Sequence, residues 1–202
     1  MKRSLLFLLF LLSTTLPGCG ISGEGYTMHL DAYTEHLAHG KSYVVLPGVM
    51  DAKAGDPKFM AAAEGLTQAL AGKGYVKAPD MDHADLALYL GYHVVEEARA
   101  PFDTFHKGSA WANPGRMFSP EYSRDVVLEA VDLARLRAND PKNMVWKIHA
   151  LSKGPSSDMV KTMPYIAAAL VKYLDTSGEA YVEVDDSLNV KPFKPEHRHQ
   201  KP

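Results

Sequence analysis

The sequence predicts an α+β domain in which a mostly antiparallel sheet carries two main helices packed on one face. Residues 85–95 alternate between apolar and other side chains with period two, as in a strand with one buried face. The segments 57–71 and 157–175 instead carry apolar residues at steps of three and four, as amphipathic helices do. Most strands are separated by turns rather than by helical crossovers, which favours antiparallel pairing.

The first part of the domain follows the order strand, strand, helix. Residues 26–30 alternate over a short stretch and predict a strand at the edge of the domain. Residues 43–46 predict a second strand, which a Pro-Gly pair ends. An Asp-Pro pair at 56–57 is typical of a helix start, and glycines at 72 and 74 are typical of its end. The apolar positions of this helix are Phe59, Ala63, Leu66 and Leu70.

The middle of the chain contains the clearest strand. Residues 75–77 predict a short strand, and a polar turn at 80–83 leads into the strand at 85–95. The face expected in the core consists of Leu86, Leu88, Leu90, Tyr92 and Val94. The opposite face consists of Ala87, Tyr89, Gly91 and His93.

The last part begins with a long loop at 102–122, which has glycines and prolines and no periodicity. Residues 124–136 and 143–151 then predict a hairpin, and the helix at 157–175 follows, with Pro164 expected to kink or split it. A short strand at 181–185 is expected to close the domain. The apolar positions of the second hairpin strand are Met144, Trp146, Ile148 and Ala150, and those of the helix are Met159, Met163, Ile166, Leu170 and Leu174. Residues 186–202 form a polar tail that is predicted to be disordered.

Residues 1–18 have the three-part plan of a signal peptide, with a positive start, an apolar run and a small, polar end. The apolar run, residues 5–12, is too short to span a bilayer, because a spanning helix needs about 20 residues. Residues 16–19, Leu-Pro-Gly-Cys, resemble the lipobox of bacterial lipoproteins, which is cleaved before a lipid-modified cysteine. The resemblance implies a lipid anchor, palmitate included, on Cys19 and a flexible tether at 19–25. An ordinary signal peptide with an incidental cysteine is the alternative.

A string of short motifs runs through residues 26–185. Its members are Tyr43 to Gly48, Gly74-Tyr75, Ala84-Asp85-Leu86, Gly91-Tyr92, Leu128 to Asp132, Val145-Trp146 and Met163-Pro164. In this order, behind a lipobox, the string resembles a family of bacterial envelope lipoproteins known only as a domain of unknown function. The resemblance implies a sheet-and-helix periplasmic domain at 26–185 with no established activity. Because Gly20 rather than an aspartate follows the cysteine, it also implies an outer-membrane location facing the periplasm.

Composition and motifs exclude several classes of function. The net charge is -2, and removal of the leader leaves 20 basic against 24 acidic residues, which argues against a nucleic-acid binder. The single cysteine permits no internal disulfide. The phosphate-binding loop, the zinc-protease helix, the dithiol pair and the serine-hydrolase elbow are all absent from the sequence. We therefore expect neither an enzyme nor a bound cofactor.

Two groups of side chains suggest metal ligands. The acidic turn formed by Asp80, Asp82, His83 and Asp85 departs from the calcium-loop pattern, because alanine occupies the third ligand position. We expect a solvated turn there and no metal. A spacing of three residues would place His36 and His39 on one face of a helical turn, and the tail holds His197 and His199. A histidine metal site is therefore an alternative for which the sequence places no third ligand.

The face opposite the predicted core is the candidate binding surface. If the leucines of residues 85–95 face the helices, Tyr89 and His93 face away from them. The same alternation turns Val145, Lys147 and His149 away if Trp146 faces inward. A mixed aromatic, histidine and aliphatic surface is typical of a partner-binding face. The alternative is a half-wet face packed under the 102–122 loop. The predicted partner-binding residues are Tyr89, His93, Lys147 and His149.

The leading functional hypothesis is a non-catalytic cell-envelope lipoprotein that is attached to the membrane through Cys19 and binds another protein or an envelope polymer. The alternative is a periplasmic accessory domain that binds a ligand or a metal through histidines. Convergence of the histidines in the fold would favour the alternative.

The anchor predicts the behaviour of a single variant. Cys19→Ser removes the acceptor of the lipid, so the precursor should stay uncleaved and unlipidated. Metabolic labelling with radioactive palmitate, together with the electrophoretic mobility of the chain, measures both effects. Label that persists in the Cys19→Ser variant would show that the anchor has been assigned to the wrong residue.

Overall fold

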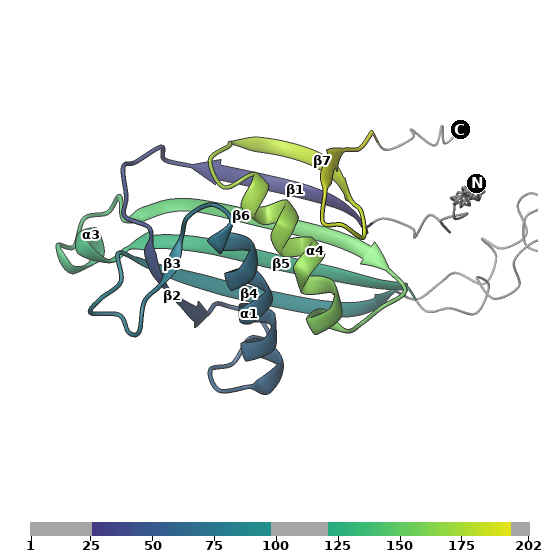
Figure 1. Ribbon diagram of the computed structural model, residues 1–202, viewed down its shortest axis with the longest axis horizontal. Coiled ribbons are helices and arrows are strands. Elements are labelled where there is room, and N and C mark those ends of the chain that lie inside the picture. Colours follow the sequence, from purple (N-terminus) through teal and green to yellow (C-terminus); the bar gives the residue numbers. More distant parts are fainter. Residues whose placement is uncertain (1–25, 98–120, 195–202) are drawn as a thin grey trace, which may run out of the picture.

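A computed structural model of the chain describes residues 26–97 and 121–194. The predicted signal peptide, Cys19, the tether and most of the 102–122 loop lie outside these ranges. The described residues form an eight-stranded sheet and three helices, so the predicted α+β class is confirmed (Figure 1). None of these helices combines the length and the apolar character that crossing a membrane requires.

Along the described part of the chain, three helices are interspersed among the strands. They are β1 (Tyr26–Thr34), β2 (Ser42–Pro47), α1 (Pro57–Ala71), β3 (Val76–Lys77), β4 (Leu86–Glu97), β5 (Glu121–Asp132), α3 (Leu133–Arg137), β6 (Met144–Gly154), α4 (Met159–Lys172), β7 (Gly178–Val184) and β8 (Val190–Pro192). Across the sheet the strands follow the order β3-β2-β4-β5-β6-β1-β7-β8.

The sheet is mixed, with parallel pairing at one edge and antiparallel pairing elsewhere. β2 runs parallel to β3 and to β4, whereas the pairs from β4 through β5, β6, β1 and β7 to β8 are antiparallel. The parallel edge was not predicted. It arises because α1 connects β2 to β3 as a crossover, which is the connection that parallel strands require. β1 was predicted at an edge but lies between β6 and β7.

An aspartate side chain caps the first turn of each of the two long helices. The carboxylate of Asp56 accepts a hydrogen bond from the Lys58 amide at 2.9 Å and caps α1, and Asp158 caps α4 by accepting from the Val160 amide at 3.0 Å. α4 continues through Pro164, so the predicted split of this helix is wrong. A proline removes one backbone hydrogen bond, and burial of the apolar face of α4 offsets that loss.

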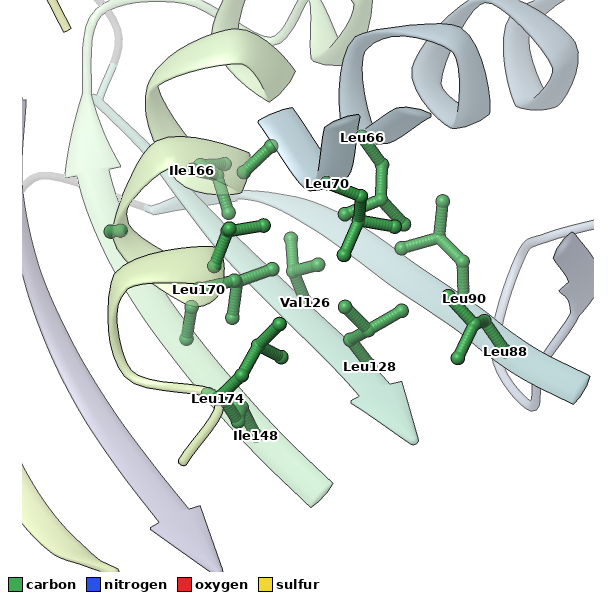
Figure 2. Packing of buried hydrophobic residues seen from close by; sticks show 14 of the residues in the cluster. Leu66, Leu70, Leu88, Leu90, Val126, Leu128, Ile148, Ile166, Leu170 and Leu174 are labelled. Carbon is green, nitrogen blue, oxygen red and sulfur yellow. The ribbon is translucent and has the colours of Figure 1, made fainter. Parts of the chain in front are cut away.

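Both helices lie side by side over one face of the sheet (Figure 1). Figure 2 shows leucines of α1 and α4 meeting the alternate apolar residues of β4, β5 and β6. The residues at this contact include Leu66, Leu70, Ile166, Leu170, Leu88, Leu90, Val126, Leu128 and Ile148, all fully buried. Trp146 is also fully buried, as the alternation of β6 predicts. These positions confirm the predicted core face of β4 and β6.

Three local predictions are wrong. Val145 was expected to face away from the core but is 1% exposed, because a register shift opposite Ala130 and Val131 places an extra residue in β6. Residues 133–137 form α3 rather than the end of a strand, since the Asp132 carboxylate accepts from the Arg135 amide at 3.0 Å and caps a helical turn. Residues 190–192, predicted as part of the disordered tail, pair with β7 as β8.

Arg124 is a fully buried cation on the helix side of β5. Its guanidinium donates to the Ser156 carbonyl at 2.7 Å and to the Ser152 hydroxyl at 3.0 Å, and it lies 5.8 Å from the centre of the Tyr26 ring. Tyr26 in turn stacks on Tyr165 at 4.2 Å. Burial lowers the pKa of Arg124. This buried group ties the beginning of β1 to β5 and to the end of β6.

The assignment of the two faces can be checked by truncation. Leu88→Ala and Trp146→Ala remove fully buried side chains, so each should lower the free energy of unfolding by about 2 to 5 kcal/mol. Met60→Ala, at a side chain that is 55% exposed on α1, is the control and should stay within about 0.5 kcal/mol. Chemical denaturation measures all three. Losses below about 1 kcal/mol at both buried positions would mean that the faces are reversed.

Candidate functional site

The face of the sheet that turns away from α1 and α4, here called the open face, carries the other set of alternating residues. Strand pairing arranges these residues in rows across β4, β5, β6 and β1. One row is Tyr89, Glu129, Lys147 and Tyr33, the next is Gly91, Val127, His149 and Asp31, and the third is His93, Asp125, Leu151 and His29. The predicted partner-binding residues therefore share one surface.

One end of the open face is closed by a small apolar cluster beside α3. It consists of Val44, Ala78, Ala84, Ala87 and Leu133. The half-buried side chain of Tyr89 packs against this cluster. Tyr89 is therefore partly a structural residue, and the remainder of its ring faces the middle of the open face.

Residues 48–51, here called the strap, cross over β4 onto the open face. The Gly48 amide donates to the Leu90 carbonyl at 2.8 Å, and the Asp51 amide donates to the Tyr92 carbonyl at 3.2 Å. Between these two bonds the strap passes directly over Gly91, where an added Cβ would lie 2.3 Å from the Val49 carbonyl oxygen. Only glycine at this position of β4 permits the crossing.

The strap presents apolar side chains in an unusual backbone conformation. Val49 is 89% exposed and Met50 is 38% exposed. Met50 also has a φ of 93°, a conformation that side-chain-bearing residues rarely adopt and that costs on the order of 1 to 3 kcal/mol. The contacts at the two ends of the strap hold this strained residue beside the sheet.

A groove with a volume of about 590 Å³ lies between the strap and the open face. Its lining is Pro47, Gly48, Val49, Met50, Tyr89, Gly91, Val127, Glu129 and Lys147. The lining is mainly apolar, and its charged members form an ion pair at 3.6 Å between Lys147 and Glu129. Such a groove suits an apolar group that is flanked by polar atoms.

Histidine and carboxylate pairs border the groove. His93 Nδ1 lies 2.5 Å from Asp51 Oδ2, which ties the end of the strap to β4. His149 Nε2 lies 2.7 Å from Asp125 Oδ1 on the neighbouring strand. Further along the face, His29 stacks on Tyr181 at 4.5 Å and approaches Glu179 at 3.6 Å, which is too long for a hydrogen bond.

The structure brings the four predicted site residues to one region but gives them different places. Tyr89 and Lys147 line the groove, whereas His93 and His149 lie beside it through their carboxylate partners. Sequence reasoning missed the strap. The signal was present in the pattern, because a glycine inside a strand often marks a close approach of another backbone, and a Pro-Gly pair precedes the strap.

The other candidate metal ligands either lie apart or form hydrogen bonds with neighbouring residues. In residues 26–97 and 121–194, no group of three or more His, Cys, Asp or Glu side chains is arranged to hold a metal ion. His36 has a φ of 52° in an irregular segment, so the expected helical turn is not formed there. His197 and His199 lie outside the described residues.

The acidic turn is closed by its own hydrogen bonds. The Asp80 carboxylate accepts from the ring of His83 at 2.7 Å, which lowers the pKa of Asp80 and raises the pKa of His83. The Asp85 carboxylate accepts from the Ser42 amide and hydroxyl at 3.0 and 2.6 Å. These carboxylates shape the turn at the start of β4.

Solved structures with low sequence identity to this chain resemble its fold. No protein-family model matches this sequence, and no curated protein matches it. A PDZ domain protein from Parabacteroides distasonis is 11% identical with a TM-score of 0.46, and the match covers 80% of this chain and 40% of that one. The chain thus spans less than half of that protein.

Two further solved structures are similar over most of their length. A PelC dodecamer from Paraburkholderia phytofirmans is 17% identical with a TM-score of 0.42, and the match covers 74% of this chain and 98% of that one. A DUF4136 family protein from Bacteroides thetaiotaomicron is 13% identical with a TM-score of 0.35, covering 75% and 95%. At these scores none of the three bears on the activity of this chain.

The close contact between the strap and β4 predicts the effect of a substitution at Gly91. Gly91→Ala should push the strap off β4, because the new Cβ meets a backbone oxygen that cannot rotate away. We expect faster amide hydrogen exchange at residues 48–51 and a loss of about 1 to 3 kcal/mol of unfolding free energy. Gly65→Ala, inside α1 and with its nearest contact at 3.4 Å, is the control. It should leave exchange at residues 48–51 unchanged and should not lower the unfolding free energy, because alanine favours a helix more than glycine does. Unchanged exchange in the Gly91 variant would show that the strap does not depend on this contact.

Proposed function

We propose that this chain is a non-catalytic binding module of the bacterial cell envelope, held on the outer membrane by lipid on Cys19 and facing the periplasm. Its open face binds another protein or an envelope polymer at the groove beside the strap. The lipobox and leader support the location, since they have the order and composition of a lipoprotein precursor.

The observation that carries the proposal is the groove under the strap. An apolar side chain that is 89% exposed stands beside a mainly apolar groove, on a backbone segment that is held in a strained conformation. Exposed apolar groups that gather in one place are typical of interaction sites. Strain that a fold retains at such a place also favours a functional role over a structural one.

The lining of the groove favours binding over catalysis. Its described lining residues include no serine, threonine, cysteine or histidine, and the side chains there that could carry a proton are Tyr89, Glu129 and Lys147. Its charged members, Glu129 and Lys147, neutralise each other. The unbranched methionine of the strap adapts to the shape of an occupant, and the exposed valine beside it adds apolar surface.

The proposal predicts that stability and binding separate at the strap. Val49→Asp with Lys147→Ala changes exposed side chains, so the melting temperature should stay nearly constant, within about 0.5 kcal/mol of stability. In-cell crosslinking from a photoreactive residue at position 50 should meanwhile lose roughly tenfold of its product, as the loss of an anchoring contact implies.

The matched control is Val76→Asp, an exposed valine on β3 outside the groove, which should leave the crosslinked product unchanged. Full crosslinking in the strap variant would place the partner surface elsewhere. Unfolding of that variant would mean that the open face is buried against another part of the chain, as in the alternative of a face packed under the loop.

A further inference from the structure

The open face carries carboxylates that the lysines of the same face do not neutralise. Lys147 is paired with Glu129 at 3.6 Å, and Lys153 is paired with Glu97 at 2.6 Å. The other carboxylates of this face include Glu121 of β5 and Glu183 of β7. The four that lie beside histidines are here called the acidic band. They are Asp31, Asp51, Asp125 and Glu179.

Histidines are the neighbours of the acidic band. His93 faces Asp51 of the strap and Asp125 of β5, and His149 faces Asp125 and Asp31. On the far side of the face, His29 faces Glu179 and Tyr181 of β7, and Lys153 lies nearby.

The acidic band lies directly against the groove. Asp51 follows Met50 in the chain, and Asp125 is two residues from Val127 on the same face of β5, which is about 7 Å along a strand. An occupant with an apolar group in the groove would thus place its neighbouring groups over Asp51 and Asp125. The charge that complements these groups is positive.

We infer that the partner presents a basic protein segment, in which an apolar side chain fills the groove and adjacent lysine or arginine side chains meet the acidic band. This inference rests on the proposed function and narrows its partner to one class. A neutral or anionic polysaccharide lacks the cations that the band requires.

Three short fluorescent peptides test the inference on the full lipidated chain in a non-ionic detergent. The first has a leucine flanked by lysines, the second has the same leucine flanked by glutamates, and the third has a serine flanked by lysines. Fluorescence anisotropy should show that the first binds roughly tenfold tighter than either of the others. Its affinity should also fall with rising salt, because salt screens the attraction between the lysines and the carboxylates.

Charge variants connect this binding to the named residues. Asp51→Asn and Asp125→Asn should each weaken binding of the lysine and leucine peptide severalfold. Asp125→Asn leaves the strap contact of Asp51 untouched, so it separates lost charge from a displaced strap. Glu64→Gln removes a negative charge from an exposed site on α1 and should have no effect.

Equal binding of the lysine and glutamate peptides, or an unchanged affinity in Asp125→Asn, would overturn the inference. Failure here is distinct from failure of the proposed function. If strap substitution abolishes crosslinking in cells while the basic peptides do not bind, the open face is a binding site for another class of partner. If the basic peptide binds as expected but crosslinking is unaffected, the proposed role of the groove in cells is wrong.

Discussion

The whole arrangement depends on burial of one face of the sheet under two helices. The buried apolar residues of β4 and β5 occupy alternate positions, and their burial against α1 and α4 supplies the main apolar contact of the domain. Because side chains of a strand alternate between faces, this burial also places the intervening residues of β4 and β5 on the open face. A shift by one residue would exchange the two sets completely. The strand residues of the proposed binding surface are therefore positioned by the same alternation that forms the core.

The strap turns an otherwise flat open face into a concave one. Gly91 has no side chain that would hold the strap away from β4. The hydrogen bond between Asp51 and His93 holds the far end of the strap. The result is an apolar groove with carboxylates on one side and a neutralised ion pair at another. An apolar anchor with a charged margin is the usual composition of a specific protein interface.

The sequence predicted the parts of the fold that periodicity controls. The buried positions of β4 and β6 and both long helices follow from apolar spacing, as does the grouping of Tyr89 and Lys147 on one face. It did not predict features that depend on contacts between distant segments, such as the parallel pairing of β2 and the path of the strap. Val145 was misassigned because a bulge interrupts the alternation at one residue, which no periodic pattern reveals.

β1 lies inside the sheet rather than at its edge, and this position has a mechanical consequence. β1 pairs with β6 on one side and β7 on the other, and its first residue packs against the buried Arg124. In a chain held through Cys19 as proposed, a pull on the anchor would act along β1 and load the hydrogen bonds on both sides together in shear. An edge strand under the same pull could instead separate one bond at a time. The domain would thus resist a pull on the anchor more strongly than it would if β1 lay at the sheet edge.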